Sequence, residues 1–244
     1  MKMRVGILTS GGDCPGLNAT IRGVAKALYQ RMGDKVEIIG ILNGYDGLIN
    51  GNYRVMAPDE FSGILTVGGT ILGTKRTPFK MMRVVGDDKV DKVAAMKKTY
   101  KDAKLDCLLC LGGNGTHKTA NLLSQEGLNI IGLPKTIDND LVLTDHTPGF
   151  GSAAKYIGAS TKEVIRDALG LTYKKNMITI MEIMGRNAGW LTGATALAKS
   201  EDCDGPDLIY LPEVPFDVEK FLAKVKDLLK KKSSIVIAVS EGIK

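Results

Sequence analysis

The stretch LDCLLCLGGNGTHKTANLL, residues 105–123, decides the fold class of this chain. It begins as an apolar run without clean alternation, turns through glycines and continues as an amphipathic segment. Such an apolar run is typical of a parallel strand that helices cover on both faces. The stretch therefore predicts a strand, a glycine turn and a helix, which is the repeating unit of an α/β protein.

The same order of apolar run, turn and amphipathic segment recurs along the chain. Strands are predicted over residues 4–10, 36–42, 105–113, 129–134, 177–185, 207–213 and 234–242. Helices are predicted over residues 17–30, 87–101, 117–125, 152–167 and 217–232. This alternation indicates an α/β protein with doubly wound, mainly parallel sheets. Proline and glycines in HTPGFGS, residues 146–152, place a predicted domain boundary after residue 147.

Composition restricts the classes of function. The 244 residues are 44% hydrophobic and 25% charged, which fits a globular protein that buries a core. The net charge of +6 comes from lysines that lie among acids, and aromatic residues make up only 5%, so we expect no nucleic-acid partner. Without an apolar run of about 20 residues or a signal-peptide pattern, we expect no membrane partner and a cytoplasmic location.

The four cysteines predict buried core thiols rather than a metal site. Cys107 and Cys110 form a C-x-x-C, but residues three apart on a strand point to opposite faces, so the two thiols would not converge. Cys14 and Cys203 have no evident partner in the sequence. Four scattered thiols fit a reducing compartment.

Glycine, polar and charged residues follow most of the predicted strands. These segments are TSGGDCPG (9–16), LGGNGT (111–116), LPKTIDND (133–140), IMGRN (183–187), LPE (211–213) and SEG (240–242). In a doubly wound sheet, ligands bind beyond the carboxyl ends of the strands. The first two segments lead into predicted helices, where backbone N–H groups can approach a phosphate closely. Neither is a Walker A or dinucleotide fingerprint, so each alone also fits an ordinary glycine turn.

The turn TIDND, residues 136–140, adds Thr136, Asp138 and Asp140 to the same set. Phosphoryl transfer needs a phosphate cradle, a divalent cation and a carboxylate that takes the proton of the acceptor hydroxyl. One aspartate would face the hydroxyl and the other the metal, whereas an Asx-type turn with solvated carboxylates is the alternative. Two glycine loops together with this turn at one sheet edge favour phosphoryl transfer.

Six segments, in order along nearly the whole chain, resemble the phosphofructokinase family: GILTSGGDCPGLNATIRG, GGTILGTKR, LGGNGT, PKTIDND, EIMGRNAGWL and PEVPF. The resemblance implies two α/β domains with the active site in the cleft between them. Residues 1–147 would bind the phosphoryl donor, and residues 148–244 would contribute to the sugar-phosphate site. The implied activity is that of a 6-phosphofructokinase in glycolysis, which transfers the terminal phosphoryl of ATP to the C1 hydroxyl of fructose 6-phosphate and gives fructose 1,6-bisphosphate.

The resemblance also implies Mg²⁺ and a homo-oligomer, a tetramer or a dimer, whose active sites take residues from a neighbouring subunit. It assigns the donor to Gly12, Arg76, Gly113, Gly115 and Thr116. It assigns the sugar-phosphate to Thr136, Asp138, Met184, Gly185, Arg186 and Glu241. Catalysis would rest on Lys135, Thr136, Asp138 as general base and Asp140, with Asn114 and Asp140 at the metal.

Three departures from the family pattern affect these expectations. Asn114 stands where the family usually has an aspartate that helps to hold Mg²⁺, which predicts weaker metal binding. Met177 aligns with an arginine that the family sends into the neighbouring subunit; Lys174 or Lys175 would have to substitute. The chain ends at VSEGIK, before the usual end of the family, so we expect a fragment that is inactive by itself.

Two residues give opposite indications about the phosphoryl donor, which stays open between ATP and pyrophosphate. In this family a glycine at position 115 leaves room for ATP, whereas an aspartate there accompanies the use of pyrophosphate. Lys135 is the residue that pyrophosphate-dependent members typically carry. The steric argument favours ATP, with a pyrophosphate-dependent enzyme as the alternative. Asn114 and Met177 also keep open a non-catalytic regulatory or binding homologue.

Overall fold

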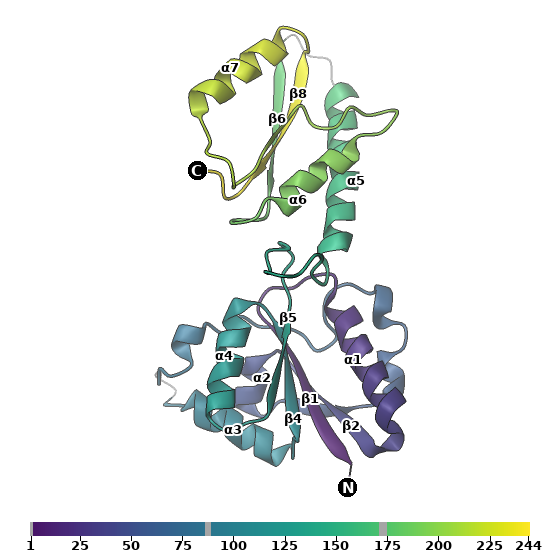
Figure 1. Cartoon of the computed structure of the whole chain (residues 1–244), viewed down its shortest axis with the longest axis vertical. Coiled ribbons are helices and arrows are strands. Elements are labelled where there is room, and N and C mark those ends of the chain that lie inside the picture. Colours follow the sequence, from purple (N-terminus) through teal and green to yellow (C-terminus); the bar gives the residue numbers. More distant parts are fainter. Residues whose placement is uncertain (1, 86–88, 171–174) are drawn as a thin grey trace. The chain divides into compact units, whose positions relative to one another are not determined.

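The computed structural model describes residues 2–85, 89–170 and 175–244. It divides into two compact units, Met1–Thr136 and Ile137–Lys244, which we call the first and the second unit. Each unit has its own sheet and its own helices (Figure 1). The compact units divide after Thr136, and the domain boundary after residue 147 stays a prediction from the sequence.

A five-stranded sheet forms the centre of the first unit. Its strands are β1 (Met3–Ser10), β2 (Val36–Ile41), β3 (Tyr53–Met56), β4 (Cys107–Gly112) and β5 (Ile130–Pro134). They lie in the order β3-β2-β1-β4-β5, with β1, β2, β4 and β5 parallel and β3 antiparallel to β2. The chain moves from β1 to β2 on one side and later to β4 on the other. The boundary between β1 and β4 is therefore the switch point where doubly wound sheets bind ligands.

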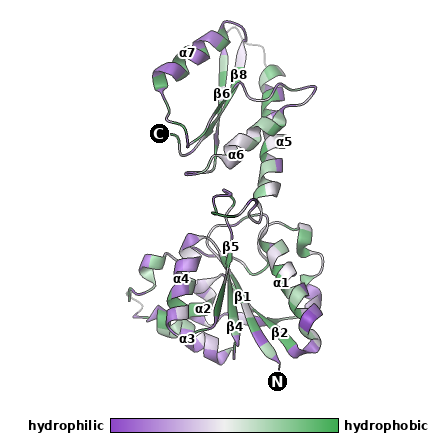
Figure 2. Ribbon diagram, viewed as in Figure 1, coloured by the Kyte–Doolittle hydropathy of each residue, from purple (hydrophilic) through white to green (hydrophobic). Residues whose placement is uncertain are grey.

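The helices of the first unit cover both faces of this sheet. They are α1 (Leu17–Met32), α2 (Tyr45–Asn50), α3 (Lys92–Asp102) and α4 (Asn114–Gln125). Figure 1 shows α1 on one side of the sheet and α2, α3 and α4 on the other. Short 3₁₀ turns lie at Gly33–Lys35, Pro58–Phe61, Ile64–Thr66 and Phe79–Met81. Figure 2 shows hydrophobic colour along the central strands, as expected for strands covered on both faces.

The second unit has a smaller, three-stranded parallel sheet. Strands β6 (Met177–Ile183), β7 (Leu208–Tyr210) and β8 (Ser234–Ser240) lie in the order β6-β8-β7. Its helices are α5 (Phe150–Gly170), α6 (Trp190–Gly193), the 3₁₀ helix Ala194–Ala198 and α7 (Val218–Leu229). Val236 packs against Ile165 of α5, whereas Ile235 and Ile237 pack against Val225 of α7. Helices α5 and α7 therefore cover opposite faces of the sheet.

Strand β6 is an edge strand that α7 leaves partly uncovered. Ile178 and Ile180 are 45% and 57% exposed, whereas Met177 and Met181 pack with the α5 cluster. Ile178 pairs in register with Ile235 and Ile180 with Ile237, so these side chains share the face that α7 covers over β8. Among the described residues, no element covers that face beyond β8 as far as β6.

Every strand and helix predicted from the sequence is present, with shifted ends. Helix α4 begins at Asn114 rather than at residue 117, and α5 extends from Phe150 to Gly170. Helix α3 begins after Asp91, whose carboxylate accepts a hydrogen bond of 3.0 Å from the backbone N–H of Ala94, and the predicted start at Asp87 lies outside the described residues. The elements β3, α2 and α6 were not predicted, because each has six residues or fewer and shows little periodicity.

All four cysteines are buried and free, as predicted. Burial raises the pKa of the Cys110 thiol to about 12, which is the behaviour of an inert core thiol. In the part of the chain that the structure describes, no helix has both the length and the apolar character needed to cross a membrane.

Candidate functional site

Three strand ends meet at one edge of the first unit. Ser10 at the end of β1 pairs in register with Gly112 at the end of β4, and Gly112 pairs with Pro134 at the end of β5. Because β1, β4 and β5 are adjacent and parallel, the segments that follow them leave the sheet on the same side. Residues 11–13, which we call the first glycine loop, therefore lie beside the loop at Gly113 and beside Lys135.

Thr116 joins the first glycine loop to the start of α4. Its buried hydroxyl donates a hydrogen bond of 2.9 Å to the carbonyl oxygen of Ser10, and its own carbonyl accepts one of 2.8 Å from the Tyr45 hydroxyl. A Cβ at Gly112 would lie 2.3 Å from the Ser10 oxygen and 2.4 Å from Thr116 Oγ1, so this position requires glycine. The side chain of Thr116 thus holds the two strand ends together.

The first turn of α4 is open at Gly115. Gly113 is the N-cap residue, Asn114 and Gly115 are exposed, and the first turn contains no acidic residue. Apart from its chain neighbours and the nearby backbone of α4, no described atom lies within 4 Å of the position that a Cβ on Gly115 would occupy. The N-terminus of a helix carries a partial positive charge and unpaired N–H groups, which suits an anion.

Two cations lie beside Gly12. A Cβ at Gly12 would lie 3.3 Å from Arg76 Nη2 and 3.9 Å from Lys135 Nζ. Arg76 is exposed, whereas Lys135 is only 6% exposed and donates a hydrogen bond of 2.6 Å to the carbonyl oxygen of Gly12. The edge of the first unit therefore combines a helix N-terminus, a glycine loop and two positive charges.

The turn TIDND crosses the boundary between the units, since Thr136 ends the first unit and Asp138 belongs to the second. Asn139, at the middle of the turn, is 6% exposed and has a left-handed backbone with φ of 56°. Its side chain accepts a hydrogen bond of 2.8 Å from Thr147 N and donates one of 3.0 Å to the Asp145 carbonyl. Sequence reasoning missed this residue, although asparagine is a residue type that tolerates this conformation.

Two strand ends meet in the second unit as well. Ile183 at the end of β6 pairs in register with Ser240 at the end of β8. The N–H of Gly185 donates a hydrogen bond of 3.0 Å to Glu241 Oε1, and the Ser240 hydroxyl donates one of 2.5 Å to the Gly185 carbonyl. Gly185 has a φ of 125°, which favours glycine.

These bonds bring the segment of residues 184–186 together with Glu241. A Cβ on Gly242 would lie 1.8 Å from the carbonyl oxygen of Arg186, so the segments after β6 and β8 touch closely. Met184 is 57% exposed and Arg186 is also exposed, so both side chains are accessible to a ligand. Ser240 was not predicted as a site residue, and its hydroxyl holds the same loop by its bond to Gly185.

Met177 lies at the opposite end of β6 from this loop. Strand β6 contains seven residues, so about 20 Å separate the two ends. Met177 is partly buried and packs with the α5 cluster, and Lys175 is exposed next to it, whereas Lys174 lies outside the described residues. Within this unit, Met177 is therefore a packing residue remote from Gly185 and Glu241.

The candidate metal residues lie in different units. Asn114 is exposed on α4 of the first unit and Asp140 is exposed in the second. The described ranges contain no cluster of three His, Cys, Asp or Glu residues that would hold a metal by themselves. Mg²⁺ usually binds one or two protein oxygens together with substrate phosphates and water, so neither residue needs a protein metal cluster around it.

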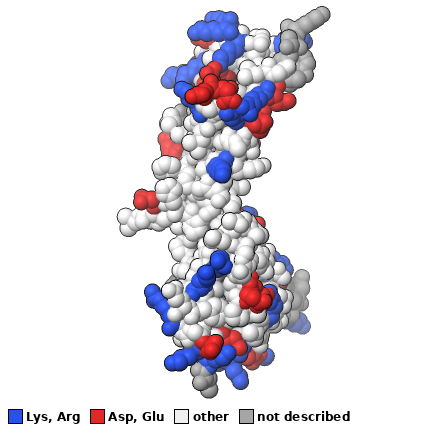
Figure 3. All heavy atoms as spheres, turned by 90° about the vertical axis from the view of Figure 1, so that its right-hand side faces the viewer, with Lys and Arg blue, Asp and Glu red and all other residues white. Residues whose placement is uncertain are grey.

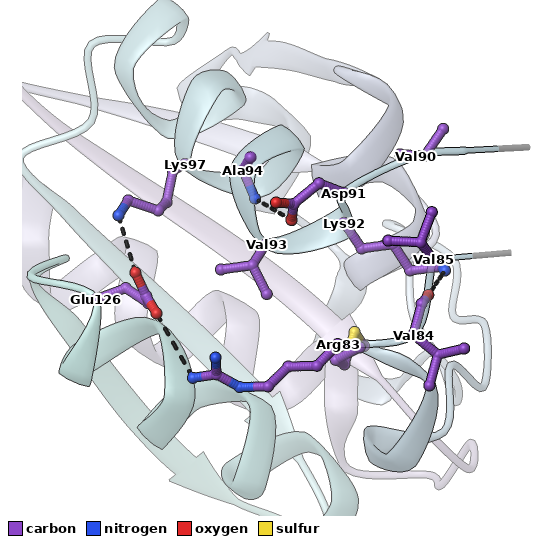
Figure 4. Close-up of a pocket in the computed structure, with 11 residues that line it drawn as sticks. Arg83, Val84, Val85, Val90, Asp91, Lys92, Val93, Ala94, Lys97 and Glu126 are labelled. Carbon is purple, nitrogen blue, oxygen red and sulfur yellow. Dashed lines mark hydrogen bonds and ion pairs between the residues drawn. The ribbon is translucent and has the colours of Figure 1, made fainter.

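A cavity of about 290 Å³ lies elsewhere in the first unit, beside the start of α3 (Figure 4). Figure 4 shows Glu126 between two cations, with Lys97 Nζ at 3.0 Å and Arg83 Nη2 at 3.6 Å. The described residues that line it include none from the first glycine loop or the start of α4. Because its charges pair with each other, we assign this cavity no part in the candidate site.

The charged side chains elsewhere are mixed in sign. Figure 3 shows Lys and Arg interspersed with Asp and Glu on the face that it draws. In the second unit, Asp202 pairs with Arg166 of α5 and lies 2.6 Å from Lys162 Nζ. Such exposed pairs contribute little to stability.

Comparison with known proteins gives consistent matches over the whole chain. The ATP-dependent 6-phosphofructokinase of Spirochaeta thermophila is 48% identical over 241 residues, which cover 97% of this chain and 63% of the relative. The ATP-dependent 6-phosphofructokinase of Propionibacterium freudenreichii subsp. shermanii is 45% identical over 248 residues, which cover 99% of this chain and 62% of the relative. The chain thus spans less than two thirds of the length of these relatives.

A solved structure agrees with this match. The pyrophosphate-dependent phosphofructokinase of Nitrosospira multiformis superposes with a TM-score of 0.82 at 30% identity, covering 99% of this chain and 61% of the other. A family model described as phosphofructokinase matches residues 4–244. The chain therefore belongs to the phosphofructokinase family.

Proposed function

We propose that this chain carries the phosphoryl-donor site and part of the sugar-phosphate site of an ATP-dependent 6-phosphofructokinase of glycolysis. The reaction transfers the terminal phosphoryl of ATP to the C1 hydroxyl of fructose 6-phosphate and gives fructose 1,6-bisphosphate. The observation that carries the proposal is the edge of the first unit, where Arg76 and Lys135 flank Gly12 beside the open first turn of α4. Such an edge binds phosphate by charge and by backbone N–H groups.

The donor would bind along this edge. Gly12, Gly113 and Gly115 allow close approach of the phosphates, and Arg76 supplies charge over the phosphoryl that is transferred. Thr116 acts by holding the loops, because its hydroxyl is already bonded to Ser10. Bound Mg²⁺, held by Asn114 and Asp140 together with donor phosphates, would neutralise charge on the phosphates.

The acceptor would use residues of the turn and of the second unit. We assign Asp138 as the general base for the C1 hydroxyl, with Thr136 beside it in the sequence as a sugar-phosphate contact. Arg186 and Met184 would line the sugar pocket, and Glu241 would fix Gly185 while its second oxygen remains available to a sugar hydroxyl. In the proposed reaction these residues would orient the hydroxyl for in-line attack on the donor.

The space at Gly115 supports ATP as the donor. A nucleotide needs room beyond the two terminal phosphates, and outside the nearby backbone of α4 no described atom lies within 4 Å of the Gly115 Cβ position. Pyrophosphate is the second candidate, because Lys135 places a buried positive charge at the same edge and the similar Nitrosospira multiformis structure is described as pyrophosphate-dependent.

Two finer expectations belong to the same proposal. In a homo-oligomer, a dimer or tetramer, a lysine next to Met177, such as the exposed Lys175, would supply the cation that Met177 does not provide. A cytoplasmic location would fit the four free thiols. Sedimentation velocity of the purified protein measures its oligomeric state directly. A single species at the monomer mass would contradict it.

The activity is tested with two proteins. One is the 244-residue chain, and the other is the same chain fused to the remaining C-terminal part of the Spirochaeta thermophila relative. We expect the fusion to form fructose 1,6-bisphosphate with ATP and Mg²⁺ and the shorter chain to be inactive. Binding of fructose 6-phosphate without turnover of either donor would instead indicate a non-catalytic binding homologue.

A further inference from the structure

Three consecutive carbonyl oxygens at the first glycine loop are each held by a different segment. Thr116 Oγ1 of α4 donates to Ser10 O at 2.9 Å, and Thr74 Oγ1 donates to Gly11 O at 2.8 Å. Lys135 Nζ, after β5, donates to Gly12 O at 2.6 Å. The loop is therefore fixed by three side chains that are far from it in the sequence.

The geometry of the peptide bond relates the direction of each of these carbonyls to the direction of the next N–H group. The peptide bonds of the described residues are trans, so each carbonyl and the N–H of the next residue point in opposite directions. Carbonyls that face Thr116, Thr74 and Lys135 therefore leave the N–H groups of Gly11, Gly12 and Asp13 directed away from these side chains. Backbone N–H groups of such a loop can bind an anion when they point to one side.

We propose that Lys135 is a positioning residue, which together with Thr74 holds the first glycine loop so that its N–H groups face the phosphoryl donor. The proposal rests on the donor site proposed above. It gives Lys135 a different role from direct contact with pyrophosphate, because one N–H of its ammonium group already donates to a carbonyl of the protein. A lysine here then serves ATP and pyrophosphate equally and does not select between them.

The burial of Lys135 supports this role. The residue is 6% exposed, and a buried ammonium group requires a partner that accepts its hydrogen bonds. Gly12 O at 2.6 Å is such a partner, and the Lys135 backbone N–H also donates to Gly112 O at 2.9 Å. Lys135 therefore connects the ends of β1, β4 and β5, and a charge-assisted bond is the strongest of the three that hold the loop.

The first test measures the loop itself in the 244-residue chain without any ligand. Lys135→Met keeps an unbranched side chain that is one atom shorter and removes the charge. Thr74→Val replaces a hydroxyl by a methyl group, and Lys101→Met is a control at an exposed lysine of α3. Amide ¹⁵N order parameters of Gly11, Gly12 and Asp13 should fall from about 0.85 to below about 0.6 in the first two variants. They should stay unchanged in Lys101→Met, and unchanged values in Lys135→Met would overturn the proposal.

The second test uses the active fusion. Loss of a charge-assisted bond predicts that kcat/KM falls about tenfold or more in Lys135→Met, by the same factor for ATP and for pyrophosphate. Thr74→Val should show a smaller loss in the same direction, and Lys135→Arg should recover part of the activity. A loss confined to pyrophosphate, with Thr74→Val like wild type, would show that Lys135 contacts the donor directly and would overturn the proposal.

The two tests separate the possible failures. If the fusion turns over neither donor, the proposed function fails, while the order parameters still decide whether Lys135 holds the loop. If Lys135→Met does not fold, as judged by circular dichroism, Thr74→Val decides the question. Unchanged order parameters of the loop and an unchanged kcat/KM in Thr74→Val would then contradict the proposal.

Discussion

Asn139 Oδ1 accepts a hydrogen bond of 2.8 Å from the backbone N–H of Thr147, eight residues further along the chain. The same side chain donates to the Asp145 carbonyl at 3.0 Å, so a single buried amide closes the loop that follows the turn. Asp138 and Asp140 flank this residue, and their positions therefore depend on a neighbour that has no assigned part in the chemistry.

We expect Asn139→Ala to lower activity through the position of the turn. The substitution removes the side-chain bond from Thr147 N to Asn139 and places an alanine in a left-handed conformation, which together cost about 1–3 kcal/mol of stability. In the active fusion, kcat should fall while the chain stays folded. Thermal unfolding and kcat are measured together, with exposed Asn121→Ala on α4 as the control. Wild-type kcat in Asn139→Ala would show that the turn holds its shape without the amide.

Asp138 is expected to be the general base. Removal of a general base typically costs about 10² to 10⁴ in rate. Asp138→Ala should therefore lower kcat by about this factor and alter the affinity for fructose 6-phosphate much less. Asp138→Asn, which keeps the shape of the side chain, should lose a similar factor. A variant within about twofold of wild type would remove Asp138 from this role.

Asn114 is expected to be a weakened metal ligand. A hard cation such as Mg²⁺ prefers a charged oxygen to an amide oxygen. Restoring the carboxylate by Asn114→Asp should therefore lower the Mg²⁺ concentration that gives half the maximal rate. The measurement is a Mg²⁺ titration of the rate at fixed donor and saturating fructose 6-phosphate. If the required concentration does not change, Asn114 lies outside the coordination of the metal.

Gly115 is expected to admit ATP through the space it leaves. Gly115→Asp places a carboxylate at the open first turn of α4, where it would repel and obstruct the nucleotide phosphates. The value of kcat/KM for ATP should collapse, whereas any activity with pyrophosphate should be spared or improved. Gly115→Ala is the control for the backbone, because outside the nearby backbone of α4 a Cβ there meets no described atom within 4 Å. ATP turnover that survives in Gly115→Asp would contradict the steric explanation.

Much of the fold could be predicted from the sequence, because parallel strands buried on both faces leave continuous apolar runs. The run at residues 107–112 is buried at every position in β4, and its flanking glycine turn lies where the pattern placed it. The four-residue strand β3 was not predicted, because it is half exposed and pairs antiparallel at the edge of the sheet. A strand this short carries too few residues for its periodicity to stand out.

The sequence indicated which residues follow the strand ends, but not the hydrogen bonds that connect these segments. The glycine loops and Arg186 follow strand ends, which a pattern of apolar runs can locate. The bonds from Thr74 to Gly11 and from Ser240 to Gly185 join segments that are more than 50 residues apart, and no local pattern in one sequence encodes such pairs. The partner of the Lys135 ammonium group likewise became visible only in three dimensions.

The uncovered edge at β6 has a practical consequence for handling the protein. An edge strand with unpaired backbone groups and protruding isoleucines is a template on which strands of other molecules can add, and it therefore promotes aggregation as the concentration rises. Ile178 and Ile180 form this row, on the open side of the sheet. Natural sheets protect such edges with an outward-pointing lysine, so Ile180→Lys is the change we would make first to keep concentrated solutions of the 244-residue chain clear.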